Sequence, residues 1–273
     1  MPESISSLEK RIRSLEIQGA KDIALESLKF LRTLTNKKGF GKDFDKAVRK
    51  LEKARPTAVV LHNCLEIIRK DKNTKTIDRL LRQLKQSDKE IALRGRNLIK
   101  NNSKIMTRCH STEALALIKQ AWKDGKKVKV YATETRPKWQ GIKTANELAK
   151  LGIPVTLIVD SAMGFFIKDV DMVIVGTDAM RKEGFVNKIG TYMLALLCKE
   201  HSKPLYVVGD TLKLDRRKKL MIEERDPDEV YVEHIKNLVV RNPAFDVTPW
   251  KYVKRVVTEK GIMTPGNVKK LLK

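Results

Sequence analysis

The feature that most constrains the fold of this chain is a change in its hydrophobic pattern near residue 102. Between residues 74 and 100 apolar side chains recur every seven positions, which predicts one long helix: Ile77, Leu84, Ile91 and Leu98. Shorter helices are predicted over residues 4–15, 20–34, 43–53 and 57–69, because glycine- or proline-containing turns separate these segments. We therefore expect an all-α N-terminal domain over residues 1–102.

After residue 102, short β-rich runs alternate with helical stretches, which is the pattern of an α/β fold with a parallel sheet. We expect a Rossmann-like domain over residues 103–273, with strands at 104–107, 127–133, 154–159, 172–175, 204–208 and 230–232, and its clearest helices at 112–123, 141–151 and 188–201. Polar loops follow several of these strands, at the edge where such sheets bind ligands. No GxGxxG or GxxxxGK(S/T) motif follows a strand, which argues against a standard nucleotide cradle.

The charge of the chain points to anionic ligands without naming one. Lysine and arginine number 57 against 33 aspartates and glutamates, a net charge of +24. Phosphorylated small molecules, RNA and acidic proteins all remain open as partners. The basic residues are scattered along the chain, and no RNA-binding module is recognisable, so RNA binding rests on charge alone.

The remaining composition disfavours several classes of protein. The three cysteines are widely spaced and the four histidines show no ligand spacing, so we expect no disulfide framework, no metal site and no cofactor. No apolar run approaches the ~20 residues of a membrane helix, and the N-terminal residues lack the apolar region of a secretory signal. We therefore expect a cytoplasmic protein without a membrane partner.

Several motifs occur in an order that resembles one known family. They are TETRPKWQG (133–141), GIPVTLIVDSA (152–162), VGTDAM (175–180), NKIGTY (187–192), RNPAFDVTP (241–249) and TEKGI (258–262). The chain is identified as a member of the family that joins the alpha, beta and delta subunits of translation initiation factor 2B to sugar-phosphate isomerases. Those isomerases act on ribose 1,5-bisphosphate or methylthioribose 1-phosphate. The resemblance implies a homodimer or a higher even-numbered assembly, paired through the α/β domain.

The resemblance implies two catalytic residues, Cys109 in MTRCHS and Asp178 in VGTDAM. Moving a carbonyl between C1 and C2 of a sugar requires groups that take and return protons, and a thiol facing a carboxylate is suited to this task. Taken alone, Cys109 would be interpreted as a small buried residue and Asp178 as a helix N-cap or a salt-bridge partner in an edge loop. The presence of both favours a pocket that is active or was active in an ancestor.

The same motif matching implies a phosphate site. Its side chains would be Arg55, Arg136, Gln140, Asn187 and Lys188, with the backbone amides of Gly19 and Ala20. We expect Lys188 in the first turn of the helix over 188–201, where its charge would add to unpaired backbone N–H groups. For any single arginine in so basic a chain, a solvated surface position is the competing interpretation.

Three departures from the isomerase pattern favour a regulatory role. Gln18 stands where the isomerases have arginine, Arg108 stands where they usually have histidine, and the loop over 181–186 is one residue shorter than theirs. Our main interpretation is therefore a subunit like initiation factor 2B alpha, which binds the alpha subunit of initiation factor 2 and senses a phosphorylated sugar or nucleotide. The alternative is an aldose–ketose isomerase of the ribose 1,5-bisphosphate type that uses Cys109 and Asp178.

Overall fold

The computed structural model describes residues 3–14, 16–17 and 19–273. By its internal contacts the chain divides into two compact units, residues 1–87 and residues 88–273. The expected domain boundary after residue 102 stays a prediction. No helix in the described part of the chain combines the length and the apolarity needed to cross a bilayer.

The first unit is helical. It holds α1 (Ile5–Arg13), α2 (Ala20–Lys38), α3 (Lys42–Ala54), α4 (Val59–Lys70) and most of α5 (Thr74–Gly95), which extends into the second unit. Each helix buries one apolar stripe, as Leu8 and Ile12 do on α1 and Phe44 and Leu51 on α3. Burial of such a side chain contributes about 1.5–3 kcal/mol.

The predicted long helix ends earlier than expected, at Gly95, and continues as a single 3-10 turn over Arg96–Leu98. At residue 95 the chain passes very close to its neighbours. A Cβ atom at Gly95 would lie 2.8 Å from both Leu117 Cδ1 and Val257 Cγ1, so only glycine fits without a shift.

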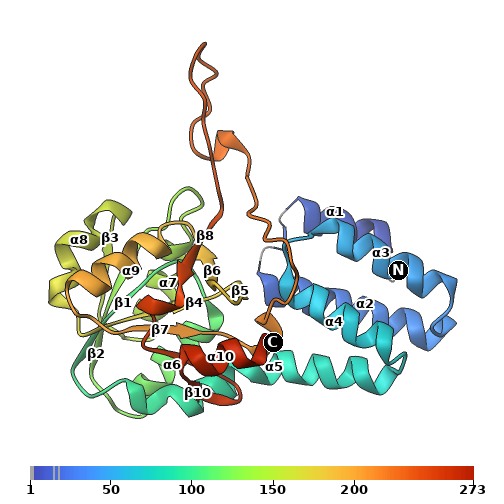
Figure 1. Ribbon diagram of the computed structural model, residues 1–273, viewed down its shortest axis with the longest axis horizontal. Helices are drawn as coiled ribbons and strands as arrows, with labels where there is room; N and C mark the ends of the chain where they lie inside the picture. The colour runs from blue at the N-terminus through green and yellow to red at the C-terminus, as the bar shows by residue number, and fades with distance from the viewer. Residues whose placement is uncertain (1–2, 15, 18) are drawn as a thin grey trace. The chain divides into compact units, whose positions relative to one another are not determined.

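The second unit is built on a seven-stranded sheet. Its strands are β1 (Ser103–Thr107), β2 (Val128–Thr133), β3 (Val155–Ile158), β4 (Met172–Gly176), β7 (Leu205–Val208), β9 (Arg255–Thr258) and β10 (Gly261–Met263). Their order is β10-β9-β7-β4-β1-β2-β3, and every pairing except β9 with β10 is parallel (Figure 1). The strand order reverses between β1 and β4, which is where ligands bind in doubly wound sheets.

Helices cover both faces of this sheet. They are α6 (Thr112–Lys123), α7 (Gln140–Ala149), α8 (Met163–Phe166), α9 (Thr191–Glu200) and α10 (Pro265–Leu271). Successive side chains of β1 point to opposite faces, so Ile105 joins the cluster with α6 and α7 while Met106 joins the one with α9 and α10. The predicted α/β fold is thus confirmed, and α6 has the predicted bounds.

A second, antiparallel sheet corrects part of the prediction. It consists of β5 (Ala179–Met180), β6 (Gly184–Lys188) and β8 (Phe245–Pro249), in the order β5-β6-β8. Lys188 ends β6 opposite Phe245 and does not begin a helix, because the ladder with β8 holds it extended and α9 starts only at Thr191. The expected strand over 230–232 is also wrong.

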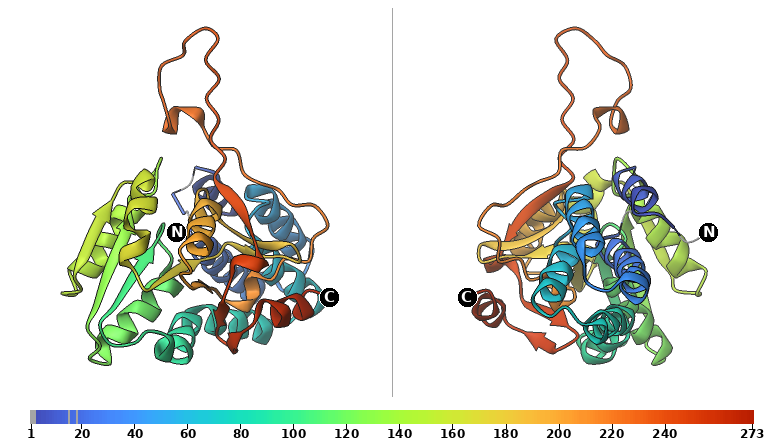
Figure 2. Two further views of the ribbon diagram at one scale, coloured as in Figure 1. Left: turned by 60° about the vertical axis from the view of Figure 1, so that its left-hand side comes forward. Right: turned by 90° about the vertical axis from the view of Figure 1, so that its right-hand side faces the viewer.

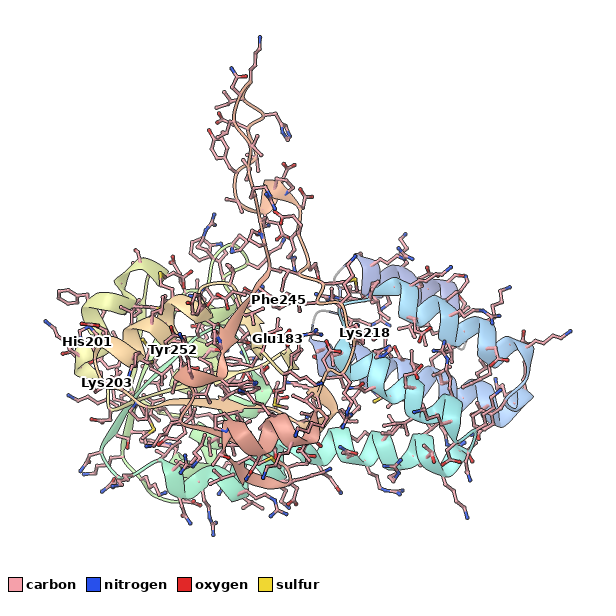
Figure 3. All side chains as sticks on the ribbon, in the orientation of Figure 1. Glu183, His201, Lys203, Lys218, Phe245 and Tyr252 are labelled. Carbon is pink, nitrogen blue, oxygen red and sulfur yellow. The ribbon has the colours of Figure 1, made fainter. Side chains whose placement is uncertain are left out.

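Residues 230–232 lie in a long loop between β7 and β8 that projects from the second unit (Figure 2). Side chains extend from both sides of this loop (Figure 3), and Val232 is 69% exposed. The Val-Tyr-Val run has high β propensity, but no strand of the described residues pairs with it. Propensity without a pairing partner does not make a strand.

Candidate active site

Cys109 and Asp178 follow the two strands on either side of the topological switch. Cys109 comes two residues after β1, Asp178 two residues after β4, and these strands are paired through Met106 and Val173. Cys109 has a left-handed backbone, with φ of 63°, and its N–H donates to Thr135 Oγ1 at 2.9 Å. A non-glycine residue in this region is strained, and such strain is concentrated at functional sites.

The surroundings of Cys109 keep its thiol protonated. Burial is the largest influence on its pKa and raises it; the charge of Asp178 also raises it, while Lys188 and Arg108 lower it. Asp178 and Lys188 therefore lie within electrostatic reach of the sulfur. The structure brings the two predicted catalytic residues and one predicted phosphate ligand together.

Lys188 is the unusual cation of this site. Four lysines and arginines are buried in the described part of the chain: Arg108, Arg181, Lys188 and Lys213. Each of the other three pairs with a carboxylate. Lys188, 6% exposed, has no ion-pair partner among the described residues, and its Nζ lies 4.9 Å from the centre of the Phe245 ring. A buried charge without a counterion is costly, so this position favours an anion.

The amides that begin α9 have a different role from the one predicted. Gly190 N and Tyr192 N donate to Asp246 Oδ2 at 2.7 and 3.1 Å. Burial raises the pKa of this carboxyl, and the helix amides oppose that rise. The start of α9 is therefore occupied by a side chain of the protein, and Lys188 does not act from the first turn of a helix. Asn187, the other predicted ligand on β6, donates from Nδ2 to Thr191 Oγ1 at 3.0 Å.

Arg136 and Gln140 belong to the segment that leads from β2 into α7. The Arg136 N–H donates to Asp160 Oδ2 at 2.8 Å, and its guanidinium stacks 4.7 Å from the ring centre of Trp139. Gln140 begins α7, and its buried Oε1 accepts no hydrogen bond from the described residues. Gly141 fixes this helix start, because a Cβ there would lie 1.6 Å from the backbone oxygen of Thr133.

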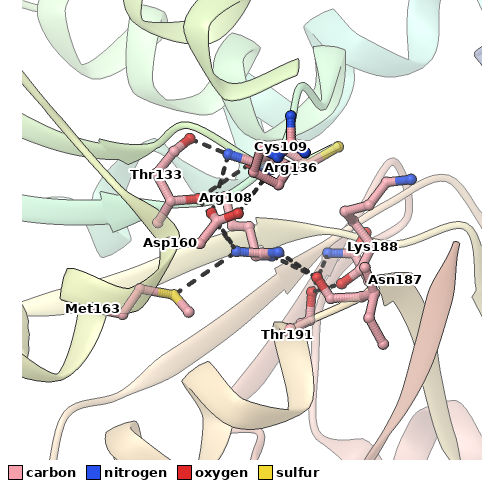
Figure 4. Close-up of polar contacts among 12 residues, drawn as sticks. Arg108, Cys109, Thr133, Arg136, Asp160, Met163, Asn187, Lys188 and Thr191 are labelled. Carbon is pink, nitrogen blue, oxygen red and sulfur yellow. Dashed lines mark hydrogen bonds and ion pairs between the residues drawn. The ribbon is translucent and has the colours of Figure 1, made fainter. Parts of the chain in front are cut away.

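Arg108 supports the loops of the site through buried polar contacts. It is 4% exposed, and Nη1 donates to Asp160 Oδ1 at 2.8 Å while Nε donates to the Ile189 oxygen at 3.0 Å (Figure 4). Asp160 also accepts from the amides of Thr135 and Arg136. This carboxylate, which the sequence reasoning missed, therefore ties together the loops after β1 and β2, and Arg108 extends the link to the loop after β6. The DSA motif at 160–162 was its only sequence signal.

The other two departures from the isomerase pattern are the short loop over 181–186 and Gln18. The loop over 181–186 is a tight hairpin between β5 and β6, closed by a 2.8 Å hydrogen bond from Arg181 N to the Gly184 oxygen. The Arg181 side chain is anchored by a buried ion pair with Asp215 at 2.7 Å, so the hairpin is firmly held. Gln18 lies outside the described residues.

Three predicted phosphate ligands belong to the first unit. Gly19 caps α2, Ala20 is the first residue of that helix, and Arg55 follows the last residue of α3. Their membership of a phosphate site with Lys188 stays a prediction. Among the described residues, no group of three or more His, Cys, Asp or Glu side chains is arranged to hold a metal ion.

Comparison with known proteins identifies the relatives of this fold and site. The chain is 40% identical to a ribose 1,5-bisphosphate isomerase of Archaeoglobus fulgidus, over 97% of this chain and 91% of the relative. It is 38% identical to a methylthioribose-1-phosphate isomerase of Acetivibrio thermocellus, over 86% of this chain and 80% of the relative. The crystal structure of a protein named translation initiation factor eIF-2B, from Pyrococcus horikoshii OT3, superimposes with a TM-score of 0.86 at 32% identity, covering 98% of this chain and 99% of that one.

These comparisons overturn the interpretation as a regulatory subunit. Relatives that match almost the whole chain at 38 and 40% identity are named as isomerases, and they favour the alternative interpretation. The expected association with the alpha subunit of initiation factor 2 rested on the rejected interpretation and loses its basis. The predicted family is confirmed, because residues 16–265 match the Initiation factor 2 subunit family. The chain belongs to the Initiation factor 2 subunit family.

Proposed function

We propose that this chain is an aldose–ketose isomerase that converts ribose 1,5-bisphosphate into ribulose 1,5-bisphosphate. The observation that carries the proposal is the buried, unpaired Lys188 beside Cys109 and Asp178 at the topological switch of the sheet. A cation in this position suits a phosphorylated substrate, and the thiol and the carboxylate suit proton transfer. The name of the Archaeoglobus relative supports the choice of sugar.

The reaction moves hydrogen from C2 to C1 and opens the sugar ring. In the proposed first step, the Asp178 carboxylate takes the proton from C2 while the bond between C1 and the ring oxygen breaks. The Cys109 thiol gives its proton to the departing ring oxygen. The electron pair of the C2–H bond becomes the second bond between C1 and C2, so the intermediate is an enol.

The second step restores both side chains. The C2 hydroxyl returns its proton to the Cys109 thiolate, its electrons form the C2 carbonyl, and Asp178 delivers its proton to C1. The role of Cys109 as the first proton donor follows from its protonation, because burial raises the pKa of its thiol and keeps it in the acid form. Neither step uses a metal or an organic cofactor.

The proposed phosphate ligands act by charge and by hydrogen bonding. Lys188 supplies a desolvated ammonium, and Arg136 supplies a guanidinium held by its stacking on Trp139. Gln140 Oε1 is a buried acceptor for a substrate hydroxyl. Asn187 Nδ2, which donates to Thr191 in this structure, is a further candidate. Gly19, Ala20 and Arg55 remain candidates for the same phosphate on sequence grounds.

The test is a phosphorus NMR time course of the purified protein with ribose 1,5-bisphosphate. We expect conversion to ribulose 1,5-bisphosphate, and a loss of at least about 100-fold in turnover for Cys109→Ser and for Asp178→Asn. Cys198→Ser is the matched control, because Cys198 is buried in the apolar cluster beneath α9, away from the site. Absence of conversion by the wild-type protein, or full activity of Cys109→Ser, would overturn the proposal.

Methylthioribose 1-phosphate belongs in the same experiment as a competing substrate. The proposed proton transfers occur at C1 and C2, which both sugars share, so the two substrates differ only at C5. The name of the Acetivibrio relative makes this comparison informative. A higher kcat/KM for the methylthio sugar would leave the proposed proton transfers unchanged but would identify methylthioribose 1-phosphate as the substrate. The predicted homodimer or higher even-numbered assembly is checked by light scattering on the same preparation.

A further inference from the structure

A buried ion pair, Lys213 with Glu113, lies near the proposed catalytic residues. The Lys213 ammonium donates to Glu113 Oε1, and the side chains are only 7% and 4% exposed. Lys213 belongs to the 3-10 turn after β7, and Glu113 lies in the first turn of α6. The pair therefore joins two segments that follow different strands of the sheet.

Lys213 lies close to the segment that carries Asp178. A Cβ atom built on Gly209 would be 2.5 Å from Thr177 Cγ2 and 3.9 Å from Lys213 Nζ, so the ammonium, Gly209 and Thr177 are packed together. Thr177 immediately precedes Asp178. Three carboxylates act on the Lys213 ammonium, namely Glu113 of α6, Asp178 after β4 and Asp210 after β7, and all three favour its charged form.

Glu113 connects the same pair to the loop of Cys109. Its Oε2 accepts a hydrogen bond from Ser111 Oγ at 3.1 Å, and Ser111 in turn caps α6 by accepting from Ala114 N at 3.2 Å. Ser111 also packs tightly against β4, because a Cβ on Gly176 would lie 2.4 Å from its Oγ. One chain of polar contacts thus runs from Ser111, in the Cys109 loop, through Glu113 to the Lys213 ammonium.

We propose that Lys213 is a positioning residue, whose buried ammonium is fixed by Glu113 and keeps Asp178 in the ionised form that accepts the substrate proton. Coulombic attraction acts strongly at this depth, because little solvent screens it. Glu113 sets the position of the cation, and through Ser111 it links that position to the loop of Cys109. The inference rests on the proposed function only in treating Asp178 as the proton acceptor.

The direct test measures the ionisation of Asp178 in the full-length resting protein. Aspartate is labelled with ¹³C at Cγ, the Asp178 signal is assigned by its loss in Asp178→Asn, and its shift is followed against pH. Lys213→Met removes the cation, so we expect the pKa of Asp178 to rise by about one pH unit or more. Glu113→Gln breaks the same ion pair but removes a negative charge, so the pKa of Asp178 is expected to stay the same or fall.

The opposite response of these two variants separates an electrostatic role from a structural one, because both disrupt the same contact. Asp210 and, through it, Glu259 face this cluster and remain unchanged in both proteins. The double variant Lys213→Met/Glu113→Gln removes both members of the ion pair, so it serves if Lys213→Met does not fold, and it is expected to show a smaller rise in the pKa of Asp178. An unchanged pKa of Asp178 without the cation, or the same rise in Glu113→Gln, would overturn the inference.

Activity gives a second, separate measurement. If the wild-type protein converts ribose 1,5-bisphosphate, the acidic limb of its kcat/KM profile is expected to move to higher pH in Lys213→Met and not in Glu113→Gln. If the wild-type protein converts no substrate, the proposed function fails, while the NMR titration still decides the role of Lys213.

Discussion

Replacing Arg108 with methionine tests whether this residue holds the site together. Methionine keeps an unbranched apolar stem but removes every donor of the guanidinium, which leaves Asp160 without its counterion. Removing one member of a buried ion pair costs about 3–5 kcal/mol. Asp160 is 20% exposed and keeps two amide donors, at 3.0 and 2.8 Å, so we expect a lower figure of about 2–3 kcal/mol.

The assay is thermal unfolding followed by calorimetry. In a domain of this size each kcal/mol lowers Tm by about 2–4 °C, so Arg108→Met is expected to melt about 4–12 °C below the wild-type protein. Arg241→Met is the matched control in the same unit. Arg241 pairs with Glu224 while 73% exposed, and such pairs contribute about 0–1 kcal/mol.

Two results would refute this reasoning. The first is a melting temperature for Arg108→Met that equals that of Arg241→Met. The second concerns Asp160→Asn in the Arg108→Met background, which removes the uncompensated charge and should recover part of the lost stability. A further fall in Tm would show that Asp160 is needed mainly for its amide contacts and not as a counterion.

Three shorter predictions concern other described residues. Gly141→Ala forces a Cβ to within 1.6 Å of a backbone oxygen, so it is expected to lower the free energy of unfolding by about 3 kcal/mol. Gly164→Ala, with its nearest atom at 3.7 Å, is expected to be tolerated, and equal melting of the two variants would contradict this. Burial raises the pKa of Asp210 from 3.8 to about 6. The folded state therefore binds this proton more tightly than the unfolded state does, which stabilises the fold by about 3 kcal/mol below pH 4. That contribution is lost as the pH rises to 6. The stability of Asp210→Asn relative to wild type should therefore increase over that window and then level off. Burial raises the pKa of both thiols, that of Cys198 to about 12, but Cys109 is partly exposed whereas Cys198 is buried. Mass spectrometry after mild alkylation near pH 9 should therefore find Cys109 modified before Cys198.

Local sequence signals predicted the elements that local interactions determine. Helix α6 was predicted with its observed bounds, because Ser111 caps it and its apolar residues have helical spacing. Lys188 was assigned to a helix because its contribution to β6 depends on pairing with Phe245, which lies far away in the chain. The run at 230–232 has the composition of a strand and no neighbouring strand. Both errors arose where tertiary pairing, or its absence, outweighed local propensity.

The same distinction between local signals and tertiary contacts applies to the candidate site. Strand ends placed Cys109 and Asp178 at one edge, because parallel strands bring their carboxyl ends together. The role of Arg108 was beyond sequence reasoning, since its partner Asp160 is 52 residues away and only the fold shows that the pair is buried. The presence of arginine where the isomerases usually have histidine was therefore wrongly taken to favour a regulatory role. A residue that differs from its counterpart in related proteins can change how the site is supported without changing what the site binds.

The net charge of +24 and the charge of the site have different consequences. Charges on the surface attract an anionic substrate over a distance and are screened by salt, whereas the desolvated Lys188 is screened much less. Three of the four buried cations in the described residues already have carboxylate partners, so Lys188 is the one available to a phosphate. Lys188→Met is therefore expected to raise KM by about 10-fold or more at both low and high salt, whereas Lys269→Met, an exposed change in α10, should leave KM within about twofold. If the defect of Lys188→Met disappeared in about 0.5 M salt, Lys188 would belong with the surface charges, and the substrate phosphate would have to be held elsewhere.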